Sequence, residues 1–258
     1  RLVSKDPDTL RGRLPTLPKF VETAKADITQ AGDQLFQALK GCDRVFMCLP
    51  QAIGSGDMER CSNAFADICK QAGVKVVVRI SSLGIDDHLQ GKGPTQGPLG
   101  EAHVKGETYL RSLGITLTSI RPTSFSTNFV KYDLPSLRSD STFSSPLGSE
   151  AAVNWVTCRD IAKVSAKALL DTSMDGKTLN VTGPASSTLT APQMTSLLEK
   201  KLGTSVRYSE VSAPPIPDLE GLWNFLRSGG FNVCTDVVKE VTGEEPESFE
   251  DFLESVLA

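Results

Sequence analysis

One pair of side chains in this sequence has the types and the spacing for proton transfer. His103 and Glu107 are four residues apart, so in a helix they share one face. A carboxylate beside an imidazole raises the pKa of the imidazole and orients its tautomer. His103 could therefore donate a proton to a bound molecule, with Glu107 as its partner. The alternative is an ordinary hydrogen-bonded pair on a helix.

Another common proton donor, a tyrosine whose pKa is lowered by a lysine four residues later, does not occur here. The three tyrosines are followed at that distance by other residue types: Tyr109 by Leu113, Tyr132 by Ser136 and Tyr208 by Ser212. Proton transfer by such a pair is thereby excluded.

Metal chemistry is also not indicated. The sequence has two histidines, His88 and His103, and six cysteines that never occur as C-x-x-C. The usual ligand spacing of a zinc site is absent. We expect no metal, and we expect the cysteines to be reduced, buried and mostly structural.

The elements that would position these residues alternate regularly between helix and strand. Apolar residues at helical spacing, each time ended by a glycine or followed by a short apolar strand, recur along the chain. The expected helix and strand pairs are 33–41 with 44–50, 57–72 with 74–80, 100–113 with 115–122, and 159–171 with 176–183. This order predicts a doubly wound α/β fold with a mostly parallel, Rossmann-like sheet.

Two irregular stretches, 84–100 and 131–152, interrupt this rhythm and are expected to be long loops. After residue 183 the pattern changes to a helix over 191–203, a strand over 206–211 and a last helix from Ser248. We therefore expect a dinucleotide-binding domain over 1–130 and 153–183. Residues 131–152 and 184–258 would form a small C-terminal α+β cap for the substrate.

Composition excludes several classes of partner. The net charge of −4 gives no basic excess for nucleic acid or an anionic membrane. The longest apolar runs are shorter than the roughly 18 residues of a membrane span. These features predict a cytoplasmic protein that binds neither nucleic acid nor membrane.

In an open α/β sheet, ligands lie beyond the carboxyl ends of the strands. Four segments follow expected strands: 1–7, 48–51, 80–84 and 121–129. Any one of them could be an ordinary turn, but all four should meet at one edge of the sheet. The sequence therefore places its candidate ligand site at this edge.

At this point the sequence resembles the NmrA-like group of atypical short-chain dehydrogenases/reductases. The resemblance covers most of the chain through SKDP, ADIT, LFQALKGCDRVFMCLP, VKVVVRISSLG, AHVKGETYLRSLGITLTSIRPTSF and VTCRDIAKVSAKAL. It implies a Rossmann-like protein that binds NADP(H) or NAD(H). Some members reduce small organic substrates, and others are regulators that sense the cofactor and bind a protein partner. Members open with a strand and a GxxGxxG turn, whereas this chain matches from the second strand, so we expect the first unit to be missing.

The resemblance implies a cofactor site at the strand ends. Ser4 and Lys5 match the position where a basic residue meets the 2′-phosphate of NADP, which favours NADP(H) over NAD(H). The alternative for Lys5 is an exposed lysine in a charged turn. Asp27 and Ile28 match the pair beside the adenine, although Asp27 could instead cap a helix.

The same comparison adds residues from the later strands. Leu49 and Pro50 resemble the loop under the dinucleotide, and Ser81 and Pro122 are placed with them as cofactor contacts. Ser82 matches a serine that hydrogen-bonds the reacting oxygen in related enzymes, while a serine that satisfies backbone groups is the alternative.

Three further residues are expected to meet the substrate. Phe125 and Asn128 fall where the pocket meets the cap in relatives, and Trp223 could line it from above, although an aromatic pair such as Trp223 and Phe225 is more often core. The hypothesis is NADPH-dependent reduction of a small organic substrate, with His103, Glu107 and Ser82 as catalytic residues. The alternative is a cofactor-sensing regulator with a protein partner.

Overall fold

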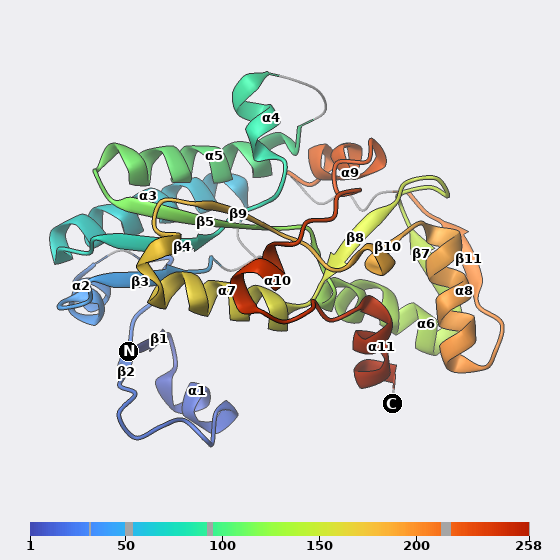
Figure 1. Cartoon of the computed structure of the whole chain (residues 1–258), viewed down its shortest axis with the longest axis horizontal. Coiled ribbons are helices and arrows are strands. Elements are labelled where there is room, and N and C mark those ends of the chain that lie inside the picture. Colours follow the sequence, from blue (N-terminus) through green and yellow to red (C-terminus); the bar gives the residue numbers. More distant parts are fainter. Residues whose placement is uncertain (31, 50–53, 92–94, 213–217, 258) are drawn as a thin grey trace.

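A four-stranded parallel sheet forms the centre of the computed structural model, which describes residues 1–30, 32–49, 54–91, 95–212 and 218–257 (Figure 1). Its strands lie in the order β3-β4-β5-β9 and are all parallel. They span Arg44–Met47 (β3), Val76–Ile80 (β4), Thr116–Pro122 (β5) and Thr178–Val181 (β9). The predicted α/β fold with a mostly parallel sheet is confirmed.

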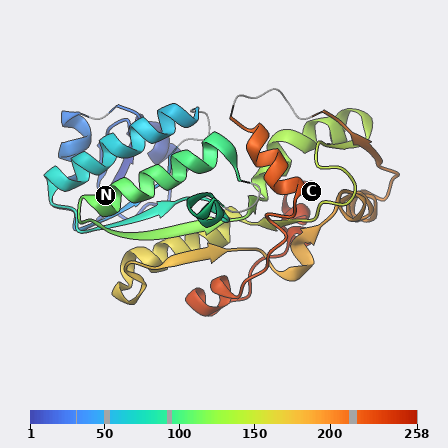
Figure 2. The ribbon, with the colours of Figure 1, turned by 90° about the horizontal axis from the view of Figure 1, so that it is seen from above.

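Helices cover both faces of this sheet. Helices α3 (Ser55–Ala72) and α5 (Gly97–Ser112) lie side by side on one face, and α7 (Cys158–Leu170) lies on the other (Figure 2). Each predicted helix is found within a few residues of its expected bounds. Helix α3 ends where Gly73 adopts a left-handed φ of 79°, a conformation that glycine adopts without steric cost.

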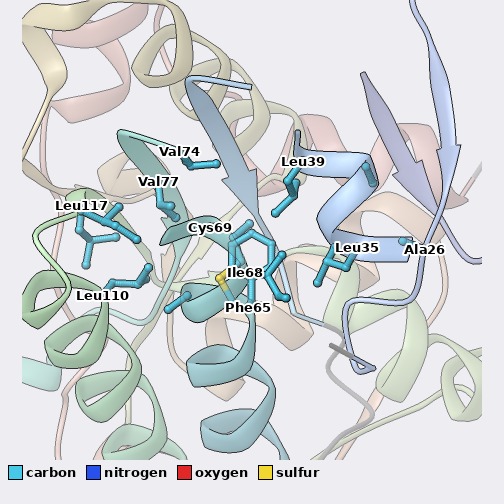
Figure 3. Packing of buried hydrophobic residues seen from close by; sticks show 14 residues of the cluster. Ala26, Leu35, Leu39, Phe65, Ile68, Cys69, Val74, Val77, Leu110 and Leu117 are labelled. Carbon is cyan, nitrogen blue, oxygen red and sulfur yellow. The ribbon is translucent and has the colours of Figure 1, made fainter. Parts of the chain in front are cut away.

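The largest apolar cluster joins α3 to the sheet and to α2 (Asp33–Leu39). Phe65, Ile68 and Cys69 of α3 point into it, and Val77 and Leu117 come from β4 and β5 (Figure 3). Cys69 has no exposed surface, and burial raises the pKa of its thiol to about 12. It packs as a small apolar side chain, as the sequence predicted. Cys48, Cys158 and Cys234 are exposed, so the prediction of buried cysteines was wrong for these three.

The first two strands form a separate parallel pair. Strand β1 (Leu2–Ser4) pairs with β2 (Thr23–Lys25), and α1 (Pro7–Arg13) connects them. Within the described residues this pair has no ladder to β3. The guanidinium of Arg1 ties the pair to α2 by donating to the carbonyl of Ala38 at 3.0 Å.

Both predicted long loops contain regular structure, so those predictions were wrong. The first holds α4 (Ile85–Gln90). The second holds a π-helix (Phe129–Asp133), α6 (Leu134–Asp140) and β7 (Thr142–Ser145). Phe129, Leu134 and Leu137 are buried together in a second apolar core, which also contains residues of α8 and α11. Tertiary packing stabilises these short elements, whose sequences are too polar and too brief to show a period.

Short elements build the C-terminal region. Strand β8 (Val153–Val156) lies between β6 (Ser124–Phe125) and β10 (Thr188–Leu189), and β7 pairs with β11 (Arg207–Glu210). Thr190 and Gln193 form a capping box at the start of α8 (Ala191–Leu202). The chain ends with α9 (Glu220–Arg227), α10 (Val237–Thr242) and α11 (Phe249–Leu257). Phe249, which has no exposed surface, joins α11 to this core.

Candidate active site at the carboxyl ends of the strands

Lys5 and Asp27 meet at the ends of β1 and β2. The Lys5 ammonium lies 2.8 Å from Asp27 Oδ2, and the Lys5 side chain is 63% exposed. Asp27 also accepts hydrogen bonds from the backbone N–H and the hydroxyl of Thr29. The hydrogen bond from Lys5, followed by those from Thr29, lowers the pKa of Asp27. The result is an accessible cation held at the sheet edge by a fixed carboxylate.

The neighbouring predicted residues have mainly packing roles in this structure. The hydroxyl of Ser4 hydrogen-bonds Asp6 within the turn after β1. Ile28 and Leu49 are half-buried against the largest apolar cluster. Asp27 does not cap α2, whose N-cap is Gly32. Pro50 lies outside the described residues.

Ser82 is held by a residue that the sequence analysis did not single out. Its hydroxyl donates to Gln96 Oε1 at 2.8 Å. Gln96, which is 1% exposed, donates in turn from Nε2 to the carbonyl of Leu83 at 2.5 Å. Ser81 is buried beside Glu107. The strand-end serines therefore differ, since Ser82 is half-buried with a defined partner and Ser81 is buried in the interior.

Glu107 is engaged by arginines rather than by His103. It accepts from Arg121 Nη2 at 2.9 Å and from Arg111 Nη1 at 3.1 Å. Its side chain is 2% exposed and that of Arg121 is 4% exposed. Burial raises the pKa of Glu107, but the hydrogen bonds and charges of Arg121 and Arg111 outweigh burial and lower it to about 2. Glu107 is thus a buried, ionised anchor between α5 and β5.

His103 carries a neutral imidazole in this environment. Burial, followed by the positive charge of Arg79, lowers its pKa to about 3. Arg79 is 1% exposed and donates from Nη1 to the carbonyl of His103 at 3.0 Å. The expected rise in the His103 pKa was wrong, because burial of the imidazole and the positive charge of Arg79 outweigh the effect of the Glu107 carboxylate. In this uncharged form, one ring nitrogen of His103 carries a proton and the other ring nitrogen can accept one.

A direct check is the titration of His103 followed by NMR of its ring protons. We expect its signals to stay at the neutral position from pH 8 down to about pH 4, because protonation would place a second cation beside Arg79. Comparison with the His103→Gln variant assigns the signals. A midpoint at or above the ordinary histidine value of about 6.5 would contradict this electrostatic description.

The residues expected at the substrate lie on three elements. Phe125 is half-buried on β6, close to buried Pro122, and Asn128 precedes the π-helix. Trp223 of α9 is half-buried, with an indole N–H that is buried without a partner in the described structure. Phe225 is core, as its spacing indicated: it is 3% exposed.

Arg79, Arg121 and Gln96 are the functional candidates that sequence reasoning missed. Arg79 and Arg121 occur inside the apolar segments VVVRI and TSIRP, and a buried arginine needs a partner. That signal was available for both residues. Gln96 had none, because it lies in a stretch that was expected to be a loop. Among the described residues no group of three or more His, Cys, Asp or Glu could hold a metal ion.

Comparison with known proteins identifies the family of the chain. The family model described as "NmrA-like family" matches residues 19–222. The chain belongs to the NmrA-like family. Prestalk A differentiation protein A of Dictyostelium discoideum is 28% identical over 235 residues, 84% of this chain and 70% of that protein. The (4-alkanoyl-5-oxo-2,5-dihydrofuran-3-yl)methyl phosphate reductase of Streptomyces griseus is 27% identical over 84% of this chain and 77% of its own.

The fold of this NmrA-like protein is also similar to the folds of solved structures of other proteins. The NADPH complex of a quinone oxidoreductase from Escherichia coli superposes with a TM-score of 0.82 at 19% identity, covering 99% of this chain and 89% of that one. At this identity the likeness shows the shared Rossmann-like fold. No helix in the described ranges combines the length and the apolar character that crossing a bilayer requires.

Proposed function

We propose that this NmrA-like protein reduces a small organic substrate with NADPH. The observation that carries the proposal is the Lys5–Asp27 pair at the carboxyl ends of β1 and β2. An exposed ammonium fixed in place there suits a 2′-phosphate, whereas a site for NAD would place an acidic residue alone against the ribose hydroxyls. Residues 1–130 and 153–183 would bind the dinucleotide, and residues 131–152 and 184–258 the substrate.

The described residues fit the adenosine end of this cofactor. Lys5 offers a cation with 63% of its side chain exposed, and Asp27 holds it at 2.8 Å. Half-buried Ile28 provides an apolar contact for the adenine, beside Ala26, which is 3% exposed. Leu49 would continue the cofactor site along the edge. Contacts of the cofactor with Ser81 and Pro122, which are buried, and with Pro50, which lies outside the described residues, stay predictions.

In this mechanism NADPH supplies the hydride when it is bound. Lys5 binds the 2′-phosphate and Asp27 orients Lys5. Ser82 positions the substrate by hydrogen bonding, and Phe125, Asn128 and Trp223 enclose it. The proton would come from water, either directly or through His103, whose neutral imidazole would give up its N–H proton while its other ring nitrogen takes one from water. Glu107 would keep α5 in place for this step.

A second candidate function is a cofactor-sensing regulator that binds a protein partner. It is favoured by the missing Tyr and Lys pair and by the His103 imidazole, whose pKa of about 3 makes it a poor acid at neutral pH. A regulator would bind NADPH with the same Lys5 contact but would not oxidise it with any acceptor.

The test is a fluorescence titration of NADPH and NADH against the protein and its Lys5→Ala variant. Loss of a charge-assisted contact should weaken NADPH binding by about ten- to a hundredfold and leave NADH binding unchanged. Lys75→Ala is the matched control, because Lys75 pairs with Asp43 at the same 2.8 Å but at the amino end of the strands.

The outcomes separate the proposals. The NADPH preference would be refuted if Lys5→Ala weakened the binding of NADPH and NADH equally. It would also be refuted if the unmodified protein bound both cofactors equally well. Binding of neither cofactor would refute the cofactor site. NADPH binding without oxidation by any of a panel of quinones and azo compounds favours the regulator.

A further inference from the structure

Ser82 and Gln96 form a hydrogen-bonded pair whose direction is set by chemistry. Gln96 Nε2 donates to the carbonyl of Leu83 at 2.5 Å. Only the amide nitrogen can donate to a carbonyl oxygen, so the amide oxygen Oε1 must face Ser82. The hydroxyl of Ser82, at 2.8 Å, is then the donor. The single proton of Ser82 is directed toward Gln96 and away from the site.

Gln96 cannot turn away from this arrangement. Its side chain is 1% exposed, and it stands as the N-cap of α5, just before Gly97 with a φ of 60°. Gly221 of α9 packs directly against this turn. The approach is so close that a Cβ atom on Gly221 would lie 2.6 Å from Gly97 Cα and 2.8 Å from the carbonyl carbon of Gln96. Cap helix α9 therefore holds Gln96 in place.

The energetic consequence is a preference at Ser82. If Ser82 turned its proton toward a bound carbonyl, the buried Oε1 of Gln96 would lose the donor that the structure gives it. A buried acceptor without a partner is destabilising. Ser82, which is half-buried, therefore offers lone pairs to a ligand at the strand ends.

We propose that Gln96 is a positioning residue that sets the hydrogen-bond polarity of the substrate site through Ser82. The site then selects substrates that present a hydroxyl or N–H donor to Ser82 over aprotic molecules of the same shape. This inference rests on the proposed function, because it takes Ser82 as a substrate contact. It goes beyond that function by naming the chemical class of the group that Ser82 recognises.

A pair of nearly isosteric probes tests the proposal: 2-amino-3-methyl-1,4-naphthoquinone and 2,3-dimethyl-1,4-naphthoquinone. They differ by an amino donor in place of a methyl group, and neither has a free quinone ring position for the exposed cysteines to attack. Binding is measured by quenching of the two tryptophans in the protein saturated with NADP⁺, which carries no hydride and leaves the probes intact. We expect the amino compound to bind about three- to tenfold more tightly than the dimethyl compound, the value of one neutral hydrogen bond.

Three variants assign this preference to Gln96. In Gln96→Met the side chain cannot accept the hydrogen bond of Ser82, so the Ser82 hydroxyl is free to donate to a ligand. The dissociation constant of the dimethyl compound divided by that of the amino compound should then fall about three- to tenfold. Ser82→Ala should bring the ratio near one. Gln71→Met, at an exposed glutamine at the end of α3, should keep the ratio of the unmodified protein. Thermal melting of each variant controls for folding.

Equal binding of both probes by the unmodified protein, or binding of neither, overturns the proposal. So does an unchanged ratio in folded Gln96→Met, and Ser82→Ala provides the same decision if Gln96→Met does not fold. NADPH oxidation is followed separately. If the dissociation constants show the expected ratios but NADPH is not oxidised, the inference stands and the reductase function fails. If NADPH is oxidised but both probes bind equally well, the reductase function stands and the inference fails.

Discussion

Replacing Glu107 with glutamine should lower the free energy of unfolding by about 3 kcal/mol, because buried Arg121 then keeps only the exposed Asp86 as an anionic partner. The Glu107 and Arg121 side chains are 2% and 4% exposed and meet at 2.9 Å. The carboxylate also holds Arg111 of its own helix. Urea unfolding followed by circular dichroism measures the change.

The matched control is Glu59→Gln. Glu59 forms an ion pair of similar length, 3.0 Å, with Lys105, but both side chains are exposed. Such pairs contribute about 0 to 1 kcal/mol. If the two variants lost equal stability, the buried network around Glu107 would not be the source of the effect.

The pH dependence of the free energy of unfolding tests the role of the ionised Glu107 carboxylate independently. The folded pKa of Glu107, about 2, lies below its ordinary value of 4.5, so the stability it contributes is complete above about pH 4.5 and is lost as the pH falls toward 2. His103, with a folded pKa near 3 against 6.5, acts in the same direction below about pH 6.5. Glu107→Gln should therefore flatten the acid limb of the stability profile.

This network also shows where sequence reasoning reached its limit. The spacing of His103 and Glu107 correctly indicated one helix, since four residues make about one turn. It could not show that Arg121 of β5 approaches Glu107 from the sheet, because contacts between elements are not encoded in local spacing. The chemistry assigned to the pair changed for that reason.

The strand-end argument concerns residues whose binding role stays a prediction. Neighbouring parallel strands bring their carboxyl ends together, and Lys5 and Asp27, which follow β1 and β2, are in contact. Gln96, by contrast, was not predicted, because it lies in a stretch without periodicity. Its role depends on the approach of Gly97 and Gly221 from distant parts of the chain. Strong periods predicted the layers of the fold, while close packing of irregular segments determined the details of the site.

The second large effect is expected at Asn154, where an aspartate should lower the free energy of unfolding by about 3 kcal/mol and weaken ligand binding at the sheet edge. Asn154 has no exposed surface. Its Oδ1 accepts from the Thr123 hydroxyl at 2.9 Å and from the Gly183 N–H at 2.8 Å. Its Nδ2 donates to the carbonyls of Gly183 and Pro184 and to the Thr188 hydroxyl. One side chain thereby links β8 to the segments that follow β5 and β9.

Asn154→Asp keeps the size of the side chain but replaces its donor by an oxygen that repels the two carbonyls. Chemical unfolding and NADPH titration of this variant are compared with those of Asn232→Asp, an exposed asparagine in the same region, which should change stability by less than about 0.5 kcal/mol. Because protonation of a buried aspartate restores one donor, the deficit of Asn154→Asp should shrink as the pH falls. Equal stability of the two variants would show that the Asn154 hydrogen bonds do not hold the sheet edge together.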